Sequence, residues 1–264
     1  MTTATAPTFD ELASELASMP NGTFLSHRSA AQLWGFWIPQ FDAVEVTCPA
    51  TERGSRYTTV VQRRRVITHR RITELADVVE HLGLPVTSLG RTWLDLAGVL
   101  GIHDLIAAGD SALRAASIDE LTERTAAMRR LRGSLRARRA VSLLDADSRS
   151  RPESRIRAGL VLAGLPKPAV NKAIYDEYGQ WIAEPDLHYK EAMLAIEYNG
   201  IVHATPERRH KDARRLLVVE RADWTVRTYT TPDAFSRLDE TVVDVHGLLL
   251  RRAPQLLARH HFRR

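Results

Sequence analysis

The feature that most constrains the fold is a short apolar run that ends in a carboxylate. The apolar run 193–196 is long enough for one buried strand, and Glu197 follows it directly. A carboxylate at the end of a buried strand is costly unless it is paired, hydrogen-bonded or bound to a metal. Asp186 follows another strand candidate and is separated from Glu197 by ten residues. We therefore expect a sheet in which two carboxylates lie at adjacent strand ends and can converge on one cation.

The pattern around this run alternates helices and strands. Ser150 opens a helix over 150–163 with the Ser-x-x-Glu spacing of a capping box, and Gly164 ends it. Strands are predicted at 173–175, 180–183, 193–198 and 224–229, and helices at 206–222 and 234–250. This order predicts an α/β domain over 150–264, in which helices flank a mixed sheet.

The first 145 residues predict a separate, mainly helical α+β domain. Helices are predicted at 9–18 and 27–34, strands at 43–48 and 57–69, and helical segments at 94–113 and 121–144. Ser26 is interpreted as a helix N-cap, and Arg91 with Asp95 as an i, i+4 ion pair. The polar stretch 145–151 is the predicted boundary between the domain at 1–145 and the domain at 150–264.

The charge and the cysteine content of the chain limit the kinds of partner and metal site that it can have. The formal net charge is +5, and arginines cluster between residues 124 and 157. Candidate phosphate-contacting residues are Arg129, Arg130, Arg132 and Arg136, although a solvated helix face would explain the same cluster. The single cysteine, Cys48, excludes a disulfide framework and a cysteine-based zinc site. With no apolar stretch long enough for a membrane span and no targeting segment, we expect a soluble, cytoplasmic chain without a membrane partner.

The residues around Glu197 resemble a known nuclease signature. The string Glu197-Tyr198-Asn199-Gly200-Ile201-Val202-His203, preceded by Pro185-Asp186, is similar to that of the very-short-patch-repair-like branch of the PD-(D/E)XK superfamily. Further marks of the branch are Glu153-Ser154-Arg155-Ile156-Arg157, Ala163-Gly164-Leu165-Pro166, Asp212 with Arg215, and Asp223-Trp224-Thr225-Val226. The ordered set spans residues 150–231.

This resemblance implies a restriction-endonuclease-like fold and hydrolysis of nucleic acid, with DNA as the expected substrate and Mg²⁺ or Mn²⁺ as the cofactor. Asp186 and Glu197 would be the metal ligands, Glu153 would orient the metal-bound water, and His203 would act as a general base or hold the leaving phosphate. Each role has a structural alternative. Asp186 could serve a turn or salt bridge, Glu197 a strand-end pair, Glu153 the capping box, and His203 an ordinary surface position.

Asn199 departs from the pattern, because the branch normally has Asp there and the wider superfamily has Lys. An asparagine amide cannot take up a proton or carry charge, so metal binding can survive while the chemical step is impaired. Two functions therefore stay open. One is a metal-dependent endonuclease, and the other is a catalytically impaired nuclease fold that binds nucleic acid or regulates as an antitoxin does.

Two segments of the first half, residues 25–35 and 84–97, resemble the core of abortive-infection type IV antitoxin proteins. The resemblance covers roughly residues 24–114 and implies a cognate toxin protein as a partner. In that family a winged helix usually precedes the first segment. Because about two dozen residues precede it here, a complete winged helix is not expected.

Overall fold

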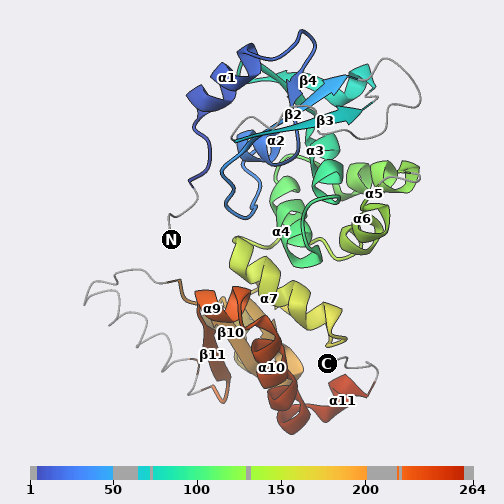
Figure 1. The fold of residues 1–264 in the computed structure, drawn as a ribbon. Helices are drawn as coiled ribbons and strands as arrows, with labels where there is room; N and C mark the ends of the chain where they lie inside the picture. The colour runs from blue at the N-terminus through green and yellow to red at the C-terminus, as the bar shows by residue number, and fades with distance from the viewer. Residues whose placement is uncertain are drawn as a thin grey trace. The chain divides into compact units, whose positions relative to one another are not determined.

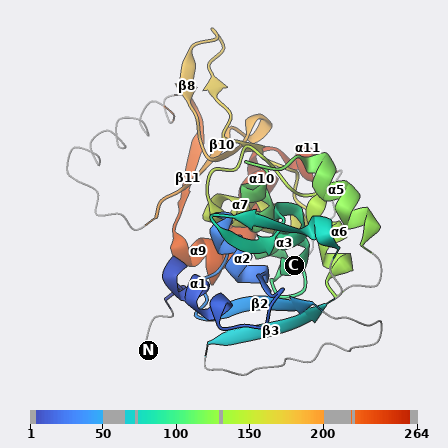
Figure 2. The ribbon, with the colours of Figure 1, turned by 90° about the horizontal axis from the view of Figure 1, so that it is seen from above.

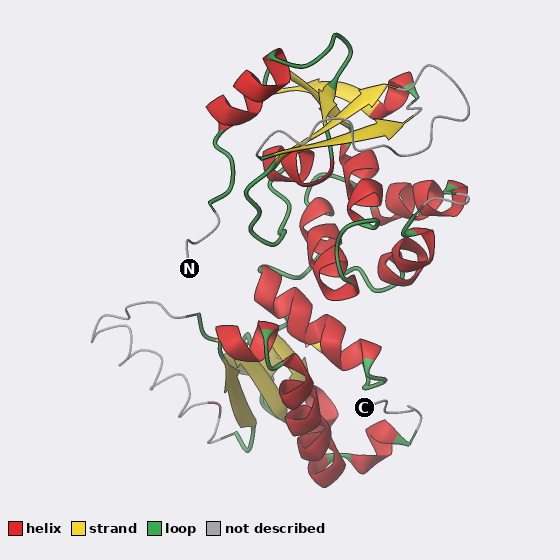
Figure 3. Cartoon of the chain, viewed as in Figure 1, coloured by secondary structure: helices red, strands yellow, loops and turns green. Residues whose placement is uncertain are grey.

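A computed structural model describes residues 5–49, 65–71, 74–128, 132–200, 219 and 222–258. The chain forms two compact units, residues 1–146 and 147–264, and each is described by itself (Figure 1). Both units combine helices with strands, which confirms the α/β class expected from the sequence (Figure 3). No helix among the described residues is long and apolar enough to cross a membrane.

The first unit is built on a five-stranded sheet with the order β3-β2-β1-β5-β4. The strands are β1 Phe24–Leu25, β2 Val44–Pro49, β3 Val66–Arg71, β4 Val78–His81 and β5 Leu84–Thr87. The helices are α1 Phe9–Ala17, α2 His27–Leu33, α3 Leu89–Leu96, α4 Ile102–Ala112, α5 Ile118–Ala127 and α6 Ser134–Val141, with a 3-10 turn, η1, at Leu75–Asp77. Leu12 and Leu16 of α1 belong to the same buried cluster as Val44 and Val46 of β2, which fixes α1 to the sheet.

Two predicted helical segments of this unit are each divided by glycine. The segment 94–113 separates into α3 and α4, with Gly101 as the N-cap of α4. The segment 121–144 separates into α5 and α6, because Gly133 precedes α6 with φ +87°, a conformation that favours glycine. The hairpin β4–β5 was not predicted, and residues 57–64 of the predicted strand 57–69 lie outside the described part.

The second unit has a four-stranded sheet in the order β11-β10-β9-β6 and a two-stranded sheet β7-β8. The strands are β6 Ala169–Val170, β7 Ile174–Tyr175, β8 Trp181–Ala183, β9 Leu187–Tyr189, β10 Leu194–Tyr198 and β11 Thr225–Tyr229. The helices are α7 Arg151–Leu162, α9 Thr231–Phe235, α10 Leu238–Arg252 and α11 Pro254–Leu257, with a 3-10 turn, η2, at Lys190–Ala192. The single helix predicted at 234–250 is thus two helices. Most of the predicted helix 206–222 lies outside the described residues.

Strand β10 is central, since it pairs antiparallel with β9 and parallel with β11. Its Leu194 and Ile196 pack in the core cluster that α7 and α10 help to form. Ala195 belongs to a second cluster with Trp224 and Ile182. Because side chains alternate along a strand, Glu197 shares the sheet face of Ala195 and not the face covered by α7 and α10.

Candidate metal-binding site

Asp186 lies one residue before β9 and is anchored at the end of β10. Its Oδ2 accepts a hydrogen bond of 2.7 Å from the backbone N–H of Tyr198. The last register pair of the ladder joins Leu187 to Ile196, so Asp186 stands opposite the position of Glu197. The carboxylate therefore accepts the hydrogen bond that a further strand residue would otherwise take, and this fixes its orientation.

Glu197 is half-buried in β10 and has Thr228 of β11 as its parallel register partner. Its neighbour Ile196 is in the core, whereas alternation turns Glu197 toward the opposite face. The structure brings Asp186 and Glu197 to neighbouring positions, as expected, but by a different route. Asp186 precedes β9, which pairs with β10, whereas the predicted strand before it, β8, belongs to the separate β7-β8 sheet.

Glu153 lies in the first turn of α7 and is only 7% exposed. Its Oε1 accepts a hydrogen bond of 2.6 Å from the Ser150 hydroxyl, and its Oε2 accepts one of 3.0 Å from the Arg149 backbone N–H. The Ser150 hydroxyl in turn accepts from the Glu153 backbone N–H at 3.4 Å. The predicted capping box is therefore correct in its Ser150 half. In the other half, the Glu153 carboxylate accepts a hydrogen bond from the backbone N–H of Arg149, the residue before the N-cap, where a capping box would use the N–H of Ser150.

Asn171 connects Glu153 to Asp186, and sequence reasoning missed it. Its side-chain amide donates to Glu153 Oε2 at 3.0 Å and to the Asp147 carbonyl at 2.9 Å. Its backbone N–H donates to the Asp186 carbonyl at 2.9 Å. Asn171 has φ +47°, a left-handed conformation that asparagine tolerates better than most residues. The only signal in the sequence was an asparagine between two short strands, which is not specific.

The other two predicted catalytic residues are placed differently. Asn199 is exposed, and its backbone N–H donates to the Tyr229 carbonyl at 2.8 Å, which extends the pairing of β10 with β11 by one residue. His203 lies outside the described residues, as do Asp212 and Arg215 of the nuclease resemblance. Their predicted roles therefore stay predictions.

The donor set at Asp186 and Glu197 fits a hard divalent cation, since both side chains offer carboxylate oxygens. Magnesium is commonly held by one or two protein carboxylates together with water and substrate phosphate oxygens. Within the described ranges, no group of three or more His, Cys, Asp or Glu side chains is arranged to hold a metal.

His188 is a further residue of this face that sequence reasoning did not single out. It lies in β9 opposite Ala195, is 6% exposed, and meets Trp224 edge to face with ring centroids 5.7 Å apart. Burial lowers the pKa of His188. The alternation of Leu187-His188-Tyr189 in the sequence would have predicted a strand here. In such a strand the His188 side chain lies on the opposite face from those of its two neighbours.

Within the arginine cluster, Arg132 and Arg136 are placed differently. Arg132 is exposed. Arg136 donates from one guanidinium nitrogen to the carbonyls of Ala97 and Leu100 at 2.8 and 2.7 Å, so it stabilises the chain after α3. Arg129 and Arg130 lie outside the described residues. Arg132 is accordingly a better candidate for phosphate contact than Arg136.

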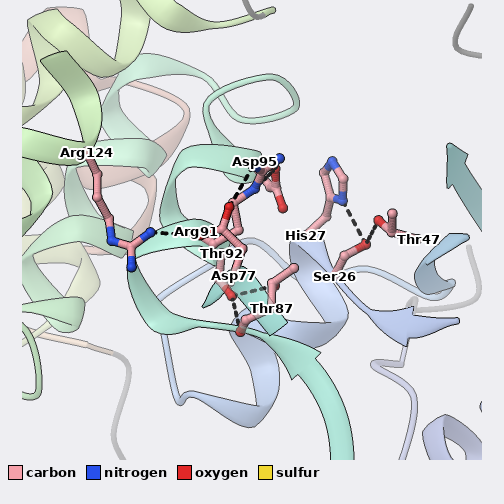
Figure 4. Close-up of polar contacts among 9 residues, drawn as sticks. All are labelled: Ser26, His27, Thr47, Asp77, Thr87, Arg91, Thr92, Asp95 and Arg124. Carbon is pink, nitrogen blue, oxygen red and sulfur yellow. Dashed lines mark hydrogen bonds and ion pairs between the residues drawn. The ribbon is translucent and has the colours of Figure 1, made fainter. Parts of the chain in front are cut away.

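A buried ionic network in the first unit confirms the predicted pair of Arg91 and Asp95 (Figure 4). Arg91 donates to Asp95 Oδ1 from two nitrogens, at 2.9 and 2.8 Å. It also contacts Asp77 at 3.2 Å, which in turn pairs with Arg124 at 2.8 Å. The network joins α3, η1 and α5, and its charges are paired with each other, so it has a structural explanation.

Ser26 is the N-cap residue of α2, as expected, but its side chain forms no capping hydrogen bond with the helix. Its hydroxyl accepts from Thr47 at 2.8 Å and lies 3.0 Å from Nδ1 of His27 (Figure 4). The fully buried Glu45 caps α2 instead, because its carboxylate accepts from the Arg28 backbone N–H at 2.7 Å. A carboxylate from a neighbouring strand thus replaces the local hydroxyl.

His27 has φ +50° and stacks on His69, with ring centroids 3.6 Å apart. Burial and the neighbouring His27 lower the pKa of His69 to about 4, while Glu45 and Asp95 act in the opposite direction. His69 is therefore neutral near pH 7. The stack joins α2 to β3.

Comparison with known proteins gives distant relatives. No family model matches the chain. It is 27% identical over 202 residues to "Uncharacterized protein MT2308" and "Uncharacterized protein Rv2248" of two Mycobacterium tuberculosis strains, a match that covers 75% of this chain and 70% of each relative. A solved structure titled "Crystal structure of RV2827C protein from Mycobacterium tuberculosis" covers 66% of this chain and 67% of its own at 17% identity, with a TM-score of 0.36. A likeness at that level carries no argument about function.

Proposed function

We propose that the second unit is a metal-dependent phosphodiester hydrolase that acts on nucleic acid in the cytoplasm, with DNA as its substrate. The observation that carries the proposal is the hydrogen bond of 2.7 Å that holds the Asp186 carboxylate at the strand end beside Glu197. Asp186 and Glu197 would hold Mg²⁺ or Mn²⁺. A bound ion of this kind supplies an activated water and neutralises charge on a phosphodiester.

The surroundings of the two carboxylates support this proposal. Asp186 is held through both its side chain and its backbone carbonyl, so its position is defined without a bound ion. Glu153 is connected to Asp186 through Asn171. A site whose ligands are already oriented loses less conformational entropy on binding than a flexible one does.

A non-catalytic nucleic-acid-binding or regulatory protein is the second candidate, with a cognate toxin as its further partner. Asn199 favours it, because this exposed amide follows Glu197 by two residues and cannot accept a proton. The Glu153 carboxylate already accepts three hydrogen bonds, which suits a structural role as well as a catalytic one.

The test is cleavage of plasmid DNA, single-stranded DNA and RNA in Mg²⁺ or Mn²⁺ by the full chain and by Asp186→Asn. An asparagine can still accept from Tyr198, so the fold is retained while the ligand charge is lost. Asp239→Asn, which neutralises an exposed acid in the first turn of α10, is the matched control. Cleavage that Asp186→Asn abolishes and Asp239→Asn leaves unchanged supports the hydrolase. Nucleic-acid binding without cleavage, in the folded wild-type protein, supports the second candidate.

A further inference from the structure

The hairpin formed by β7 and β8 carries an unusual concentration of exposed aromatic rings. Tyr175 is 55% exposed, Tyr178 81% and Trp181 59%. Among the described residues, four exposed large hydrophobic side chains are aromatic, and the fourth is Phe9. Three of four therefore lie within seven consecutive residues, whereas single exposed apolar side chains elsewhere need no explanation.

The hairpin holds these rings in fixed positions. Tyr175 and Trp181 are register partners across the two strands, so they lie on the same face, next to a register shift between Ile174 and Tyr175. Ile174 and Ile182 are buried in the cluster that contains Ala195 of β10, which attaches the opposite face to the rest of the unit. At the tip, Asp176 Oδ1 accepts from the backbone N–H groups of Tyr178 and Gln180 at 2.9 and 2.8 Å. Ordering the hairpin on binding would therefore cost little entropy.

The hairpin is continuous with the candidate metal site. Strand β8 ends at Ala183, three residues before Asp186. At the extended rise of about 3.3 Å per residue, Trp181 lies within about 16 Å of Asp186 along the chain. Figure 2 shows the strand pair extending away from the sheet that contains β10 and β11. A nucleic acid with a phosphate at Asp186 could thus reach the rings within a few nucleotides.

The chemistry of the hairpin favours bases over an aliphatic protein surface. All of its exposed large apolar side chains are planar rings, and every nucleobase offers a planar face for stacking. Of the nearby acids, Glu184 pairs with Arg149 at 2.6 Å and the Asp176 carboxylate accepts the two backbone N–H groups of the turn, whereas Glu177 at the tip is exposed. Stacking on the rings, and not attraction of phosphates, would therefore supply the binding energy at the hairpin.

We propose that the β7–β8 hairpin is a base-stacking platform that binds the unpaired bases of single-stranded nucleic acid beside the candidate hydrolytic site, through Trp181, Tyr175 and Tyr178. This inference rests on the proposed function for its choice of ligand. It adds a substrate preference for single-stranded or locally melted nucleic acid, since bases inside a duplex already stack on each other.

The experiment measures binding of a fluorescein-labelled single-stranded DNA 20-mer, and of an abasic oligomer of equal length and charge, in EDTA to prevent cleavage. The full chain is compared with Trp181→Leu, Trp181→Phe and Phe9→Leu. Stacking on one ring is typically worth about tenfold in affinity. We expect Trp181→Leu to weaken binding of the base-containing oligomer about tenfold and to leave the abasic oligomer unaffected. Trp181→Phe retains most of the affinity, and Phe9→Leu matches wild type.

Two results would overturn the platform. One is an equal effect of Trp181→Leu on the base-containing and abasic oligomers, or no effect on either. The other is a wild-type dimer that Trp181→Leu converts to a monomer in sedimentation, because the rings would then contact a second copy of the chain. Failure of the platform proposal can be distinguished from failure of the hydrolase proposal. Ring-dependent binding without Mg²⁺-dependent cleavage supports the platform and rejects the hydrolase, and the reverse result rejects only the platform.

Discussion

The side-chain amide of Asn171 donates to the Glu153 carboxylate at 3.0 Å while its backbone N–H donates to the carbonyl of Asp186. One residue thus connects the first turn of α7 to the chain that enters β9. Asn171 is 8% exposed and has φ +47°, so it combines a strained backbone with buried hydrogen bonds. Such a combination persists only where the surrounding contacts fix it.

Two substitutions at Asn171 separate its backbone role from its amide role. Asn171→Gly keeps the left-handed conformation but removes the hydrogen bonds to the Glu153 carboxylate and the Asp147 carbonyl, and we expect a loss of about 1–3 kcal/mol in the free energy of unfolding. Asn171→Asp places a second carboxylate beside Glu153, and the expected loss is larger, roughly 3–5 kcal/mol at pH 7. Urea unfolding measures both. Equal stability of Asn171→Asp and wild type at pH 7 would contradict this account.

His69 gives the first unit an acid sensitivity with a defined sign. Its folded-state pKa of about 4 lies below the ordinary 6.5, so the unfolded chain binds more protons between these values. The stability that the neutral ring contributes is complete above pH 6.5 and is lost as the pH falls toward 4. The charged and titratable groups that set this shift are His27, Arg28, Glu45 and Asp95.

His69→Gln should therefore flatten the decline in stability between pH 6.5 and pH 4, although it also removes the ring stack with His27. The measurement is the melting temperature across this range. His246→Gln, a substitution in α10 of the second unit, is the control for removing a histidine. A decline as steep in His69→Gln as in the control would show that His69 does not cause it.

Gly133 should tolerate no side chain. A Cβ there would overlap the backbone carbonyl of Ala97, and the residue has φ +87°. Gly133→Ala should cost about 1–3 kcal/mol for the backbone conformation alone, with the overlap adding to it. Gly101→Ala is the matched control, because φ at Gly101 is −66° and no atom lies within 4 Å of the added Cβ. Thermal unfolding compares the two, and similar melting temperatures would contradict the prediction.

Substitution of Arg136 in α6 and of Arg132 in the turn before it should affect different properties of the protein. Arg136→Ala removes the donor to two carbonyls after α3, so we expect lower thermal stability. Arg132→Ala, alone or with Arg129→Ala and Arg130→Ala, should leave stability unchanged while reducing nucleic-acid affinity and its salt dependence. The slope of log affinity against log salt concentration is the readout. An unchanged slope in the folded triple variant would mean that the cluster is only a solvated surface.

Asn199 decides between the two functional candidates. General acid–base assistance is typically worth about 10² to 10⁴ in rate. If Asn199 replaces an acidic group with such a role, Asn199→Asp should raise the cleavage rate by part of that range without changing DNA affinity, and His203→Ala should remove the gain. Cleavage rates in excess Mg²⁺ are the measurement. A lower rate for Asn199→Asp would instead identify Asn199 as the working residue.

Sequence patterns predicted both ends of β7, β8, β10 and β11 to within one residue. Each of these strands is a short apolar or β-branched run bounded by turn residues. The neighbouring positions of Asp186 and Glu197 depend on β9, which lies between Asp186 and β10 and was not predicted. Strands β6 and β9 were missed, although Leu187-His188-Tyr189 in β9 does alternate, and β6 has only two residues. Hairpin β4–β5 was missed because Pro85 lies inside it and its polar residues obscure the alternation.

Contacts between distant parts of the chain could not be predicted. Local spacing predicted Ser26 at the N-cap of α2, but the carboxylate that caps this helix is Glu45, from a strand that begins eleven residues after α2 ends. Asn171 acquires its role only when α7 and β9 come together. Such roles depend on tertiary packing, which residue patterns in one sequence do not encode locally.

During synthesis, β10 emerges long before the strand that completes its pairing. Its parallel partner β11 begins at Thr225, and the ribosome adds about 5–20 residues per second, so one edge of β10 stays unpaired for seconds. An unpaired edge of an apolar strand is a template for aggregation. Nascent chains that end before residue 225 should therefore need chaperone protection.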